Sequence, residues 1–207
     1  MEVRLSNIRR IFIDNILPVA FLTIFLSFGL IGGCGGSGGS GGTVSSNTGF
    51  GFTDVTSQSG LSYTHGFLSG GPSGEMQLIS GGVAAGDYDE DGWVDLYIVK
   101  GNDGSNMLFR NQGNGTFVNV ANLAGVALSG VISSGPIFAD FSGDGYLDLF
   151  VGAIFPHKVS LFINNGNGTF TNITYMELES AINSEFTFSA AFGDYDLDND
   201  LDLYMTH

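Results

Sequence analysis

The 207-residue sequence predicts an all-β fold made of β-propeller blades, each with four short antiparallel strands. One acidic motif occurs three times, and its first residues, Asp87, Asp140 and Asp194, lie 53 and 54 positions apart. Short apolar segments flank every copy. The 33 glycines and the 13% of charged residues are typical of a turn-rich β protein rather than a helical one. A repeat of this length with four strand-sized segments has the size of one blade.

The first repeat contains four such segments in sequence. Residues 82–86 lead into the acidic motif and residues 96–99 lead out of it. Residues 106–111 form a third segment, which a Gly/Asn turn connects to a fourth at residues 116–120. We expect these segments to be the four strands of the first blade.

The second repeat follows the same order, and the third contains its opening half. The expected strands of the second repeat are residues 136–139, 149–152, 159–164 and 169–173, and those of the third are residues 189–193 and 203–205. The expected blades cover about residues 82–135, 136–188 and 189–207, the last one partial. Two and a half blades make an incomplete propeller, because closed propellers have at least about four. We therefore expect a fragment of a longer protein, or a chain that assembles with another.

Each acidic motif places side-chain oxygens at positions 1, 3, 5 and 9 of a tight loop. Such oxygens converge around a hard cation such as calcium (Ca²⁺), because without one the carboxylates repel each other. A backbone carbonyl at position 7 is expected to add a ligand. The predicted calcium ligands are Asp87, Asp89, Asp91, Trp93 and Asp95; Asp140, Ser142, Asp144, Tyr146 and Asp148; Asp194, Asp196, Asp198, Asp200 and Asp202.

The loop sequence favours a strand–loop–strand site. Position 6 is Gly92, Gly145 or Asn199, the residue types that adopt positive φ at the lowest cost. An EF-hand would require a Glu at position 12 and flanking helices, whereas position 12 here lies within apolar segments. An aromatic residue at position 2 and an aliphatic one at position 8 are expected to fix the loop to a core. These residues are Tyr88, Phe141 and Tyr195 at position 2, and Val94, Leu147 and Leu201 at position 8.

A second interpretation of each motif is a solvated turn, because Asp, Asn and Gly favour turns for local reasons. Three copies in register favour the metal. The second loop has only three acidic ligands, since Ser142 replaces a carboxylate, and if affinity follows ligand charge it should bind calcium most weakly.

The distribution of charge argues against nucleic acid as a partner. The formal net charge is −15, and three of the six basic residues lie in the first ten positions. The three loops hold five, three and five of the 21 acidic residues. The acidity therefore belongs mostly to the predicted metal sites.

The N-terminus reads as a bacterial lipoprotein signal, residues 1–33. Basic residues precede an apolar stretch at residues 16–30, which is short for a membrane span. The residues before Cys34, the chain's single cysteine, resemble a lipobox, so we expect a lipid anchor on Cys34. Residues 34–49 then form a Gly/Ser-rich tether. A buried or spare surface thiol and an uncleaved anchor at residues 16–30 are the alternatives.

This signal predicts an exported protein, held by lipid in the cell envelope at the outer membrane or cell surface. Calcium outside the cytoplasm is abundant enough to fill sites with Kd of roughly 10⁻⁴ to 10⁻³ M. With one cysteine, the chain has no disulfide to stabilise it, so bound metal would have to do so.

From about residue 50 to residue 207 the chain resembles FG-GAP or VCBS-type repeats. These occur in integrin α-subunit propellers, in the cartilage acidic protein family and in bacterial surface lipoproteins. The matching motifs are Asp-x-Asp-x-Asp-Gly-x-x-Asp-Leu, Asn-x-Gly-Asn-Gly-Thr-Phe, and the lead-in at residues 52–56 and 59–61. The resemblance implies a calcium-binding recognition or adhesion module with a protein or glycan ligand at the cell surface.

The alternative function is the N-terminal part of a propeller enzyme, carbohydrate-active or similar, whose active residues lie in other blades. No catalytic residue is expected in this sequence. The Asp residues are spaced to share an ion, and neither a nucleophile elbow nor a phosphate loop is present. His65, His157 and His207 share no repeat position and read as ordinary loop residues.

Overall fold

The computed structural model describes residues 10–12, 52–66, 80–101, 104–154, 157–174 and 187–206. The chain divides into two compact units, Met1–Ile13 with Val55–His207, and Asp14–Asp54. The first unit contains all the strands. Cys34, the tether and all of the expected signal except Arg10–Phe12 lie outside the described residues and stay predictions.

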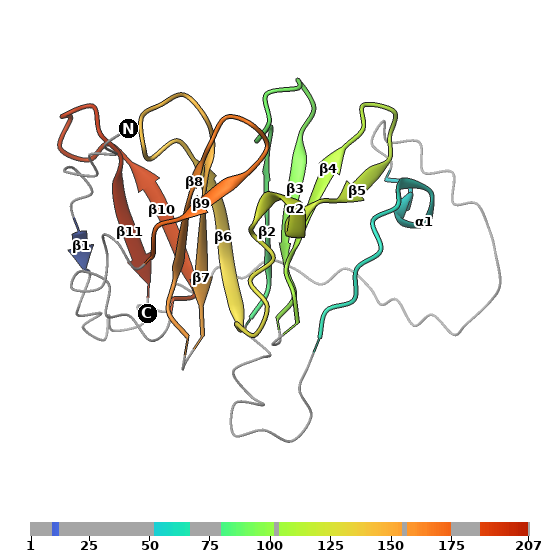
Figure 1. Ribbon diagram of the computed structural model, residues 1–207. Coiled ribbons are helices and arrows are strands. Elements are labelled where there is room, and N and C mark those ends of the chain that lie inside the picture. The colour runs from blue at the N-terminus through green and yellow to red at the C-terminus, as the bar shows by residue number, and fades with distance from the viewer. Residues whose placement is uncertain are drawn as a thin grey trace, which may run out of the picture. The chain divides into compact units, whose positions relative to one another are not determined.

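The first sheet has four strands in the order β2-β3-β4-β5, and every neighbouring pair is antiparallel. The strands are β2 (Gly82–Gly86), β3 (Asp95–Val99), β4 (Met107–Asn111) and β5 (Phe117–Asn119). Gly86 pairs with Asp95, so the first acidic loop connects β2 to β3 as a hairpin. The sheet is the predicted first blade (Figure 1).

The second sheet repeats this arrangement in the order β6-β7-β8-β9. Its strands are β6 (Ser133–Ala139), β7 (Asp148–Ala153), β8 (Ser160–Asn164) and β9 (Phe170–Asn172). The third sheet pairs β10 (Ser189–Gly193) with β11 (Asp202–Thr206) in an antiparallel hairpin, and β1 (Arg10–Phe12) lies parallel to β11. The all-β prediction is confirmed, and the three sheets do not close into a ring within the described residues.

Strand β6 begins three residues earlier than the sequence indicated, because the first and second sheets meet there. The Gly135 N–H donates to the Gly81 carbonyl at 3.2 Å, and the Gly81 N–H donates to the Ser133 carbonyl at 3.3 Å. The β6–β7 register shifts between Ser134 and Ile137, around a proline that has no N–H to donate. Ser134 Oγ in turn donates to the Thr187 carbonyl at the start of the third sheet.

The hydrophobic core consists of two layers on either side of the second sheet. Side chains along a strand alternate between faces, so Leu149 and Val151 of β7 pack toward the first sheet while Phe150 packs toward the third. All residues of β7 and β8 are buried. In β3 every second residue is buried, and Tyr97 and Val99 face the layer shared with the second sheet. The apolar runs of the middle repeat follow from this burial on both faces.

Two single-turn helices, α1 (Thr56–Ser59) and α2 (Ala121–Ala124), were not expected from the sequence. Each ends at a glycine in the left-handed conformation, Gly60 at φ 75° and Gly125 at φ 81°. No helix among the described residues is long and apolar enough to span a membrane.

Candidate metal centre

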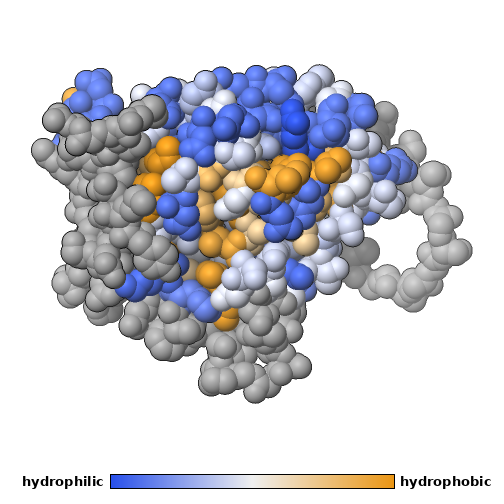
Figure 2. Space-filling model, viewed as in Figure 1, coloured by the Kyte–Doolittle hydropathy of each residue, from blue (hydrophilic) through white to orange (hydrophobic). Residues whose placement is uncertain are grey.

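The three acidic loops connect β2 to β3, β6 to β7 and β10 to β11, all at the same end of the sheets, the upper edge in Figure 1. The Gly/Asn turns between β4 and β5 and between β8 and β9 lie at this end as well. Figure 2 shows hydrophilic residues gathered along this edge and hydrophobic ones below it, over the sheets.

The Asp at position 9 of each loop is the first residue of a strand and is buried. In the first loop, Asp95 Oδ2 accepts the Tyr88 N–H at 3.3 Å and Oδ1 accepts the Asn111 N–H at 2.7 Å. The equivalent donors to Asp148 are Phe141 at 3.1 Å and Asn164 at 2.8 Å, and Asp202 accepts from Tyr195 at 2.9 Å. All three carboxylates hold the loop to its own start, and Asp95 and Asp148 also hold it to the third strand of their sheet.

Burial gives two of these carboxylates an unusual pKa. It raises the pKa of Asp95 and that of Asp148 to about 6, although the hydrogen bonds from Asn111 and Asn164 pull in the opposite direction. A cation beside these groups would stabilise their charged form.

The Asp at position 1 organises the rest of the loop. Asp87 accepts the N–H of Asp91 at 3.1 Å with Oδ1 and that of Gly92 at 2.9 Å with Oδ2. Asp140 and Asp194 make the same pair of contacts in their loops. The chain therefore wraps around this carboxylate, with position 6 at positive φ as expected, namely Gly92, Gly145 and Asn199.

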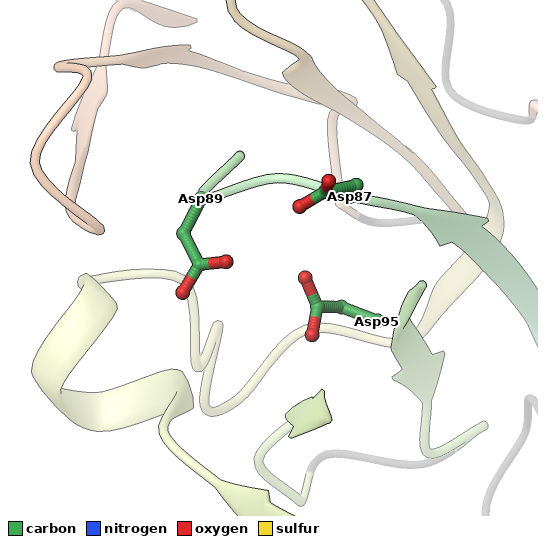
Figure 3. A group of neighbouring side chains, drawn as sticks. All are labelled: Asp87, Asp89 and Asp95. Atoms are coloured by element: carbon green, nitrogen blue, oxygen red, sulfur yellow. The ribbon is translucent and has the colours of Figure 1, made fainter. Parts of the chain in front are cut away.

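Three carboxylates of the first loop meet at one point. Oxygens of Asp87, Asp89 and Asp95 lie within 4.8 Å of one another, and Figure 3 shows the three side chains directed at a common centre. The third loop gathers Asp194, Asp196 and Asp202 in the same way. The second loop has Asp140, Ser142 and Asp148 at these positions, with a hydroxyl in place of one carboxylate.

The oxygen at position 3 provides the test of whether a cation fits. Asp89 Oδ1 is buried and has no hydrogen-bond partner, and Ser142 Oγ, at the same position of the second loop, is buried beside Asp148. Only 10% of the Asp89 side chain is exposed. Buried polar atoms without a partner are uncommon, and carboxylate and hydroxyl oxygens are ligands that calcium prefers. The residues present therefore fit a hard divalent cation.

The carboxylates at position 5 accept a hydrogen bond from within their own loop. Asp91, Asp144 and Asp198 accept the position-7 N–H at 3.0 Å and are not among the carboxylates that come within 4.8 Å of each other. Their role as ligands, and that of the position-7 carbonyls of Trp93, Tyr146 and Asp200, stays a prediction.

The aromatic side chains at position 7 pack on the Gly/Asn turns. A Cβ on Gly113 would lie 2.7 Å from Trp93 Nε1, and one on Gly166 would lie 2.8 Å from Tyr146 Cε2. A side chain at either glycine would displace the aromatic ring, and both glycines also have positive φ, so the turn motif and the acidic loop pack as one structural unit.

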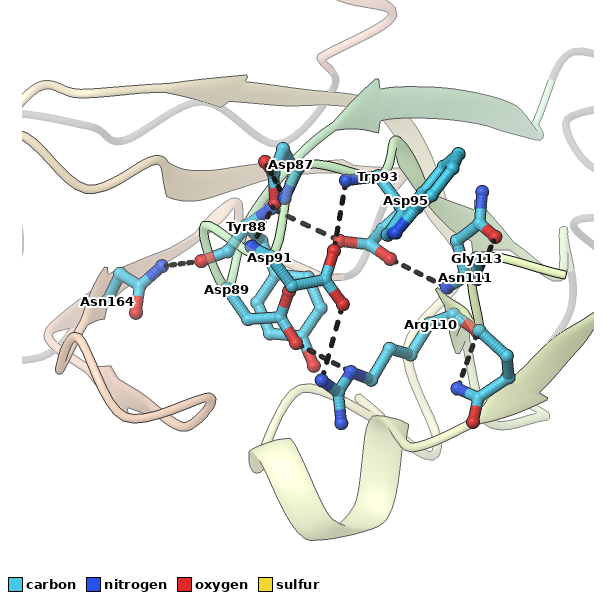
Figure 4. A network of polar contacts seen from close by, with 12 residues as sticks. Asp87, Tyr88, Asp89, Asp91, Trp93, Asp95, Arg110, Asn111, Gly113 and Asn164 are labelled. Atoms are coloured by element: carbon cyan, nitrogen blue, oxygen red, sulfur yellow. Dashed lines mark hydrogen bonds and ion pairs between the residues drawn. The ribbon is translucent and has the colours of Figure 1, made fainter.

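Arg110 is part of the site, although the acidic motif by itself does not indicate it. Its Nε lies 2.6 Å from Asp89 Oδ2 and its Nη2 3.3 Å from Asp91 Oδ2, as Figure 4 shows. Burial and repulsion from Asp91 and Asp87 outweigh this guanidinium, so the pKa of Asp89 is raised. One feature of the sequence could have indicated it: Arg110 is one of only three basic residues after residue 33, and it lies in the third expected strand of the first repeat.

The loops also contact the neighbouring sheet. Asn164 Nδ2 donates to the carbonyl of Tyr88 in the first loop at 2.8 Å, and the Tyr88 ring stacks on Phe170 with centroids 5.6 Å apart. Phe141 stacks on Phe192 of the third sheet in the same way. The prediction that position 2 attaches the loop to a core is confirmed for Tyr88 and Phe141.

The prediction that positions 2 and 8 fix the loop to a core is wrong for two residues, Tyr195 at position 2 and Val94 at position 8. Tyr195 is 69% exposed and Val94 is 54% exposed. Leu147, the equivalent of Val94, packs against Gly86 of the preceding sheet, whereas the described residues place no sheet against the same face of the first one.

Comparisons with known proteins agree with this repeated architecture. The family model of the FG-GAP-like repeat matches residues 87–151 and 148–205, which together make up more than half of the chain. Cartilage acidic protein 1 of Xenopus tropicalis is 30% identical over 128 residues, and that of Mus musculus is 31% identical over 128 residues. Each match covers 61% of this chain and 19% of the relative, so the chain spans about a fifth of the length of these proteins.

Proposed function

Since the chain belongs to the FG-GAP-like repeat family, we propose that it is a calcium-binding recognition or adhesion module, held by lipid at the surface of a bacterial cell. The observation that carries the calcium proposal is the convergence of Asp87, Asp89 and Asp95, with a buried Asp89 oxygen that has no hydrogen-bond partner. The third loop repeats the same group of three carboxylates.

Calcium has a structural role in this proposal. Three carboxylates within 4.8 Å repel one another strongly at an effective dielectric constant near 20, and a divalent cation converts that repulsion into attraction. In the first two loops the position-9 carboxylate also holds the loop to the third strand, so bound calcium would stabilise the whole hairpin rather than the loop alone. Millimolar calcium outside the cytoplasm would fill such sites.

The proposed recognition of a protein or glycan rests on the repeats. More than half of the chain matches FG-GAP-like repeats, which supports an extracellular module that recognises a protein or glycan rather than an enzyme. The carboxylates that glycoside hydrolysis would need accept backbone N–H groups here or converge on the proposed cation site.

The anchor is the acyl-modified Cys34, with the signal of residues 1–33 removed. A Cys34→Ser variant expressed in cells that are labelled with a fatty-acid probe should lose both the label and membrane association. Membrane association of the variant without the label would show that residues 16–30 act as an uncleaved anchor instead.

Isothermal titration of the full-length chain tests the metal. We expect calcium uptake that Asp196→Ala reduces by about one site, because alanine leaves no oxygen at this place in the third carboxylate group. Glu90→Gln is the matched control, since it removes one exposed charge at position 4, outside the proposed ligands. Equal loss from both variants, or no heat beyond that of magnesium, would contradict the proposal.

A further inference from the structure

The guanidinium of Arg110 lies beside two of the carboxylates that are proposed to bind calcium in the first loop. It precedes Asn111, whose N–H bonds to Asp95, and its guanidinium reaches Asp89 at 2.6 Å and Asp91 at 3.3 Å. Figure 4 shows this side chain extending from the strand to the carboxylates of the loop. One oxygen of each of two proposed ligands is therefore already paired with a positive charge.

The second blade lacks both partners of this pair. The residue 53 positions after Arg110 is Ile163, and the residue 53 positions after Asp89 is Ser142. Beside Asp144 there is a cavity of about 380 Å³, lined in part by Ile163, and no guanidinium. Counted over positions 1, 3, 5 and 9, four carboxylates with one guanidinium and three carboxylates alone both carry a charge of −3.

We propose that Arg110 is an internal competitor of calcium at the first loop, which offsets the extra carboxylate of Asp89 and lowers the calcium affinity of this loop to about that of the second. This inference rests on the proposed binding of calcium by the loops. A divalent cation that enters the first loop must share Asp89 and Asp91 with the guanidinium or displace it. In the second loop, Ile163 offers no such competition.

The first loop can be observed separately from the others. Trp93 is the chain's one tryptophan and lies at position 7 of this loop. Terbium, a trivalent substitute for calcium at oxygen sites, emits when a nearby tryptophan transfers excitation to it. Trp-excited terbium luminescence of the full-length chain, followed by competition with calcium, therefore reports the affinity of the first loop alone.

We expect Arg110→Ile to raise the calcium affinity of the first loop at least about tenfold, because it removes a like charge next to the cation. Asp89→Ser alone should weaken binding, since the guanidinium then stays beside Asp91. Asp89→Ser with Arg110→Ile copies the second loop and should return the affinity to within about threefold of the wild type. Lys158→Gln is the control: it removes a positive charge from an exposed residue between β7 and β8, at the opposite end of the sheet.

A second measurement, thermal unfolding, needs no terbium and compares the metal-free protein with the calcium-loaded one. In EDTA, Arg110→Ile should lower the melting temperature, because Asp89 and Asp91 lose their counter-ion. In saturating calcium the order should reverse, with the variant melting above the wild type. Arg110→Gln keeps most of the side-chain volume and should show the same reversal if Arg110→Ile does not fold.

The outcomes separate this inference from the proposed function. No terbium or calcium binding in the wild type would overturn the proposed calcium role itself. Calcium binding by the wild type, together with unchanged or weaker affinity in both Arg110 variants, would overturn the competitor role and leave Arg110 as a structural ion pair.

Discussion

Position 4 of each acidic loop has a left-handed backbone, which the sequence did not predict. Glu90, Gly143 and Leu197 have φ of 56°, 74° and 61°. Only the second loop has the residue that this conformation favours. Position 6 was predictable because Gly or Asn stands there in all three loops, whereas Glu and Leu at position 4 do not indicate a left-handed backbone.

Replacing Leu197 with glycine should therefore stabilise the protein by about 0.5–1 kcal/mol. Glycine relieves the left-handed strain, and its greater conformational freedom in the unfolded chain offsets part of that gain. Little burial is lost, because Leu197 is 83% exposed. Chemical denaturation measures the change. Leu197→Ala keeps a Cβ at positive φ and is the control, and an equal gain from alanine would show that strain at this position is not the cause.

Asp95 and Asp148 predict how stability depends on pH. Without metal, their folded pKa is about 6, above the ordinary pKa of 3.8 for an unfolded Asp. Between these values the folded state binds more protons than the unfolded one, so stability in EDTA should fall as the pH rises from about 4 to about 6. With calcium the trend should weaken or reverse, because calcium binds the deprotonated form. Melting temperatures that rise with pH in EDTA would contradict this.

At the scale of elements, Asn164 at the end of β8 connects the second sheet to the first, and Asn111 occupies the same position in the first repeat. Asn164 donates to the Leu147 carbonyl of its own sheet at 3.0 Å and to the Tyr88 carbonyl of the first sheet at 2.8 Å. Its counterpart Asn111 donates only to its own sheet, to the Val94 carbonyl at 3.1 Å, among the described residues. The two asparagines therefore form a matched pair that differs in the contact between sheets.

Asn164→Ala should cost about 2–3 kcal/mol of stability, and Asn111→Ala about 1 kcal/mol less, because only the former leaves a carbonyl of the neighbouring sheet without its donor. Urea unfolding of both variants in calcium gives the difference. Equal losses would indicate that the contact between sheets adds nothing to stability.

At the scale of elements, the strands and loops of the two full repeats were predictable, because apolar runs, acidic ladders and Gly/Asn turns recur with a period near 53. The early start of β6 was not predictable, because Ser133, Ser134 and Gly135 are polar or small. These residues are extended because they bond to Gly81, which precedes the first sheet. The exposure of Tyr195 was equally hidden, since its sequence context matches that of the buried Tyr88.

For the molecule as a whole, burial depends on neighbouring sheets. The second sheet is buried on both faces because sheets pack against each side of it, while Val83, Val94 and Val118 of the first blade are about half exposed or more. Repeats of this kind gain stability from their interfaces, so a metal that stiffens one loop acts on the adjacent blade as well. Tyr88 and Phe141, adjacent to proposed ligands, provide that connection through their stacked partners.

The most direct measurement of the central claim is thermal unfolding of the full-length chain in EDTA, in calcium and in an equal concentration of magnesium. Each site filled at ten times its Kd should add about 1.4 kcal/mol of stability. We therefore predict a melting temperature that rises clearly with calcium, rises much less with magnesium and falls on chelation. A melting curve that is the same in EDTA and in calcium would contradict the claim and identify the acidic loops as solvated turns.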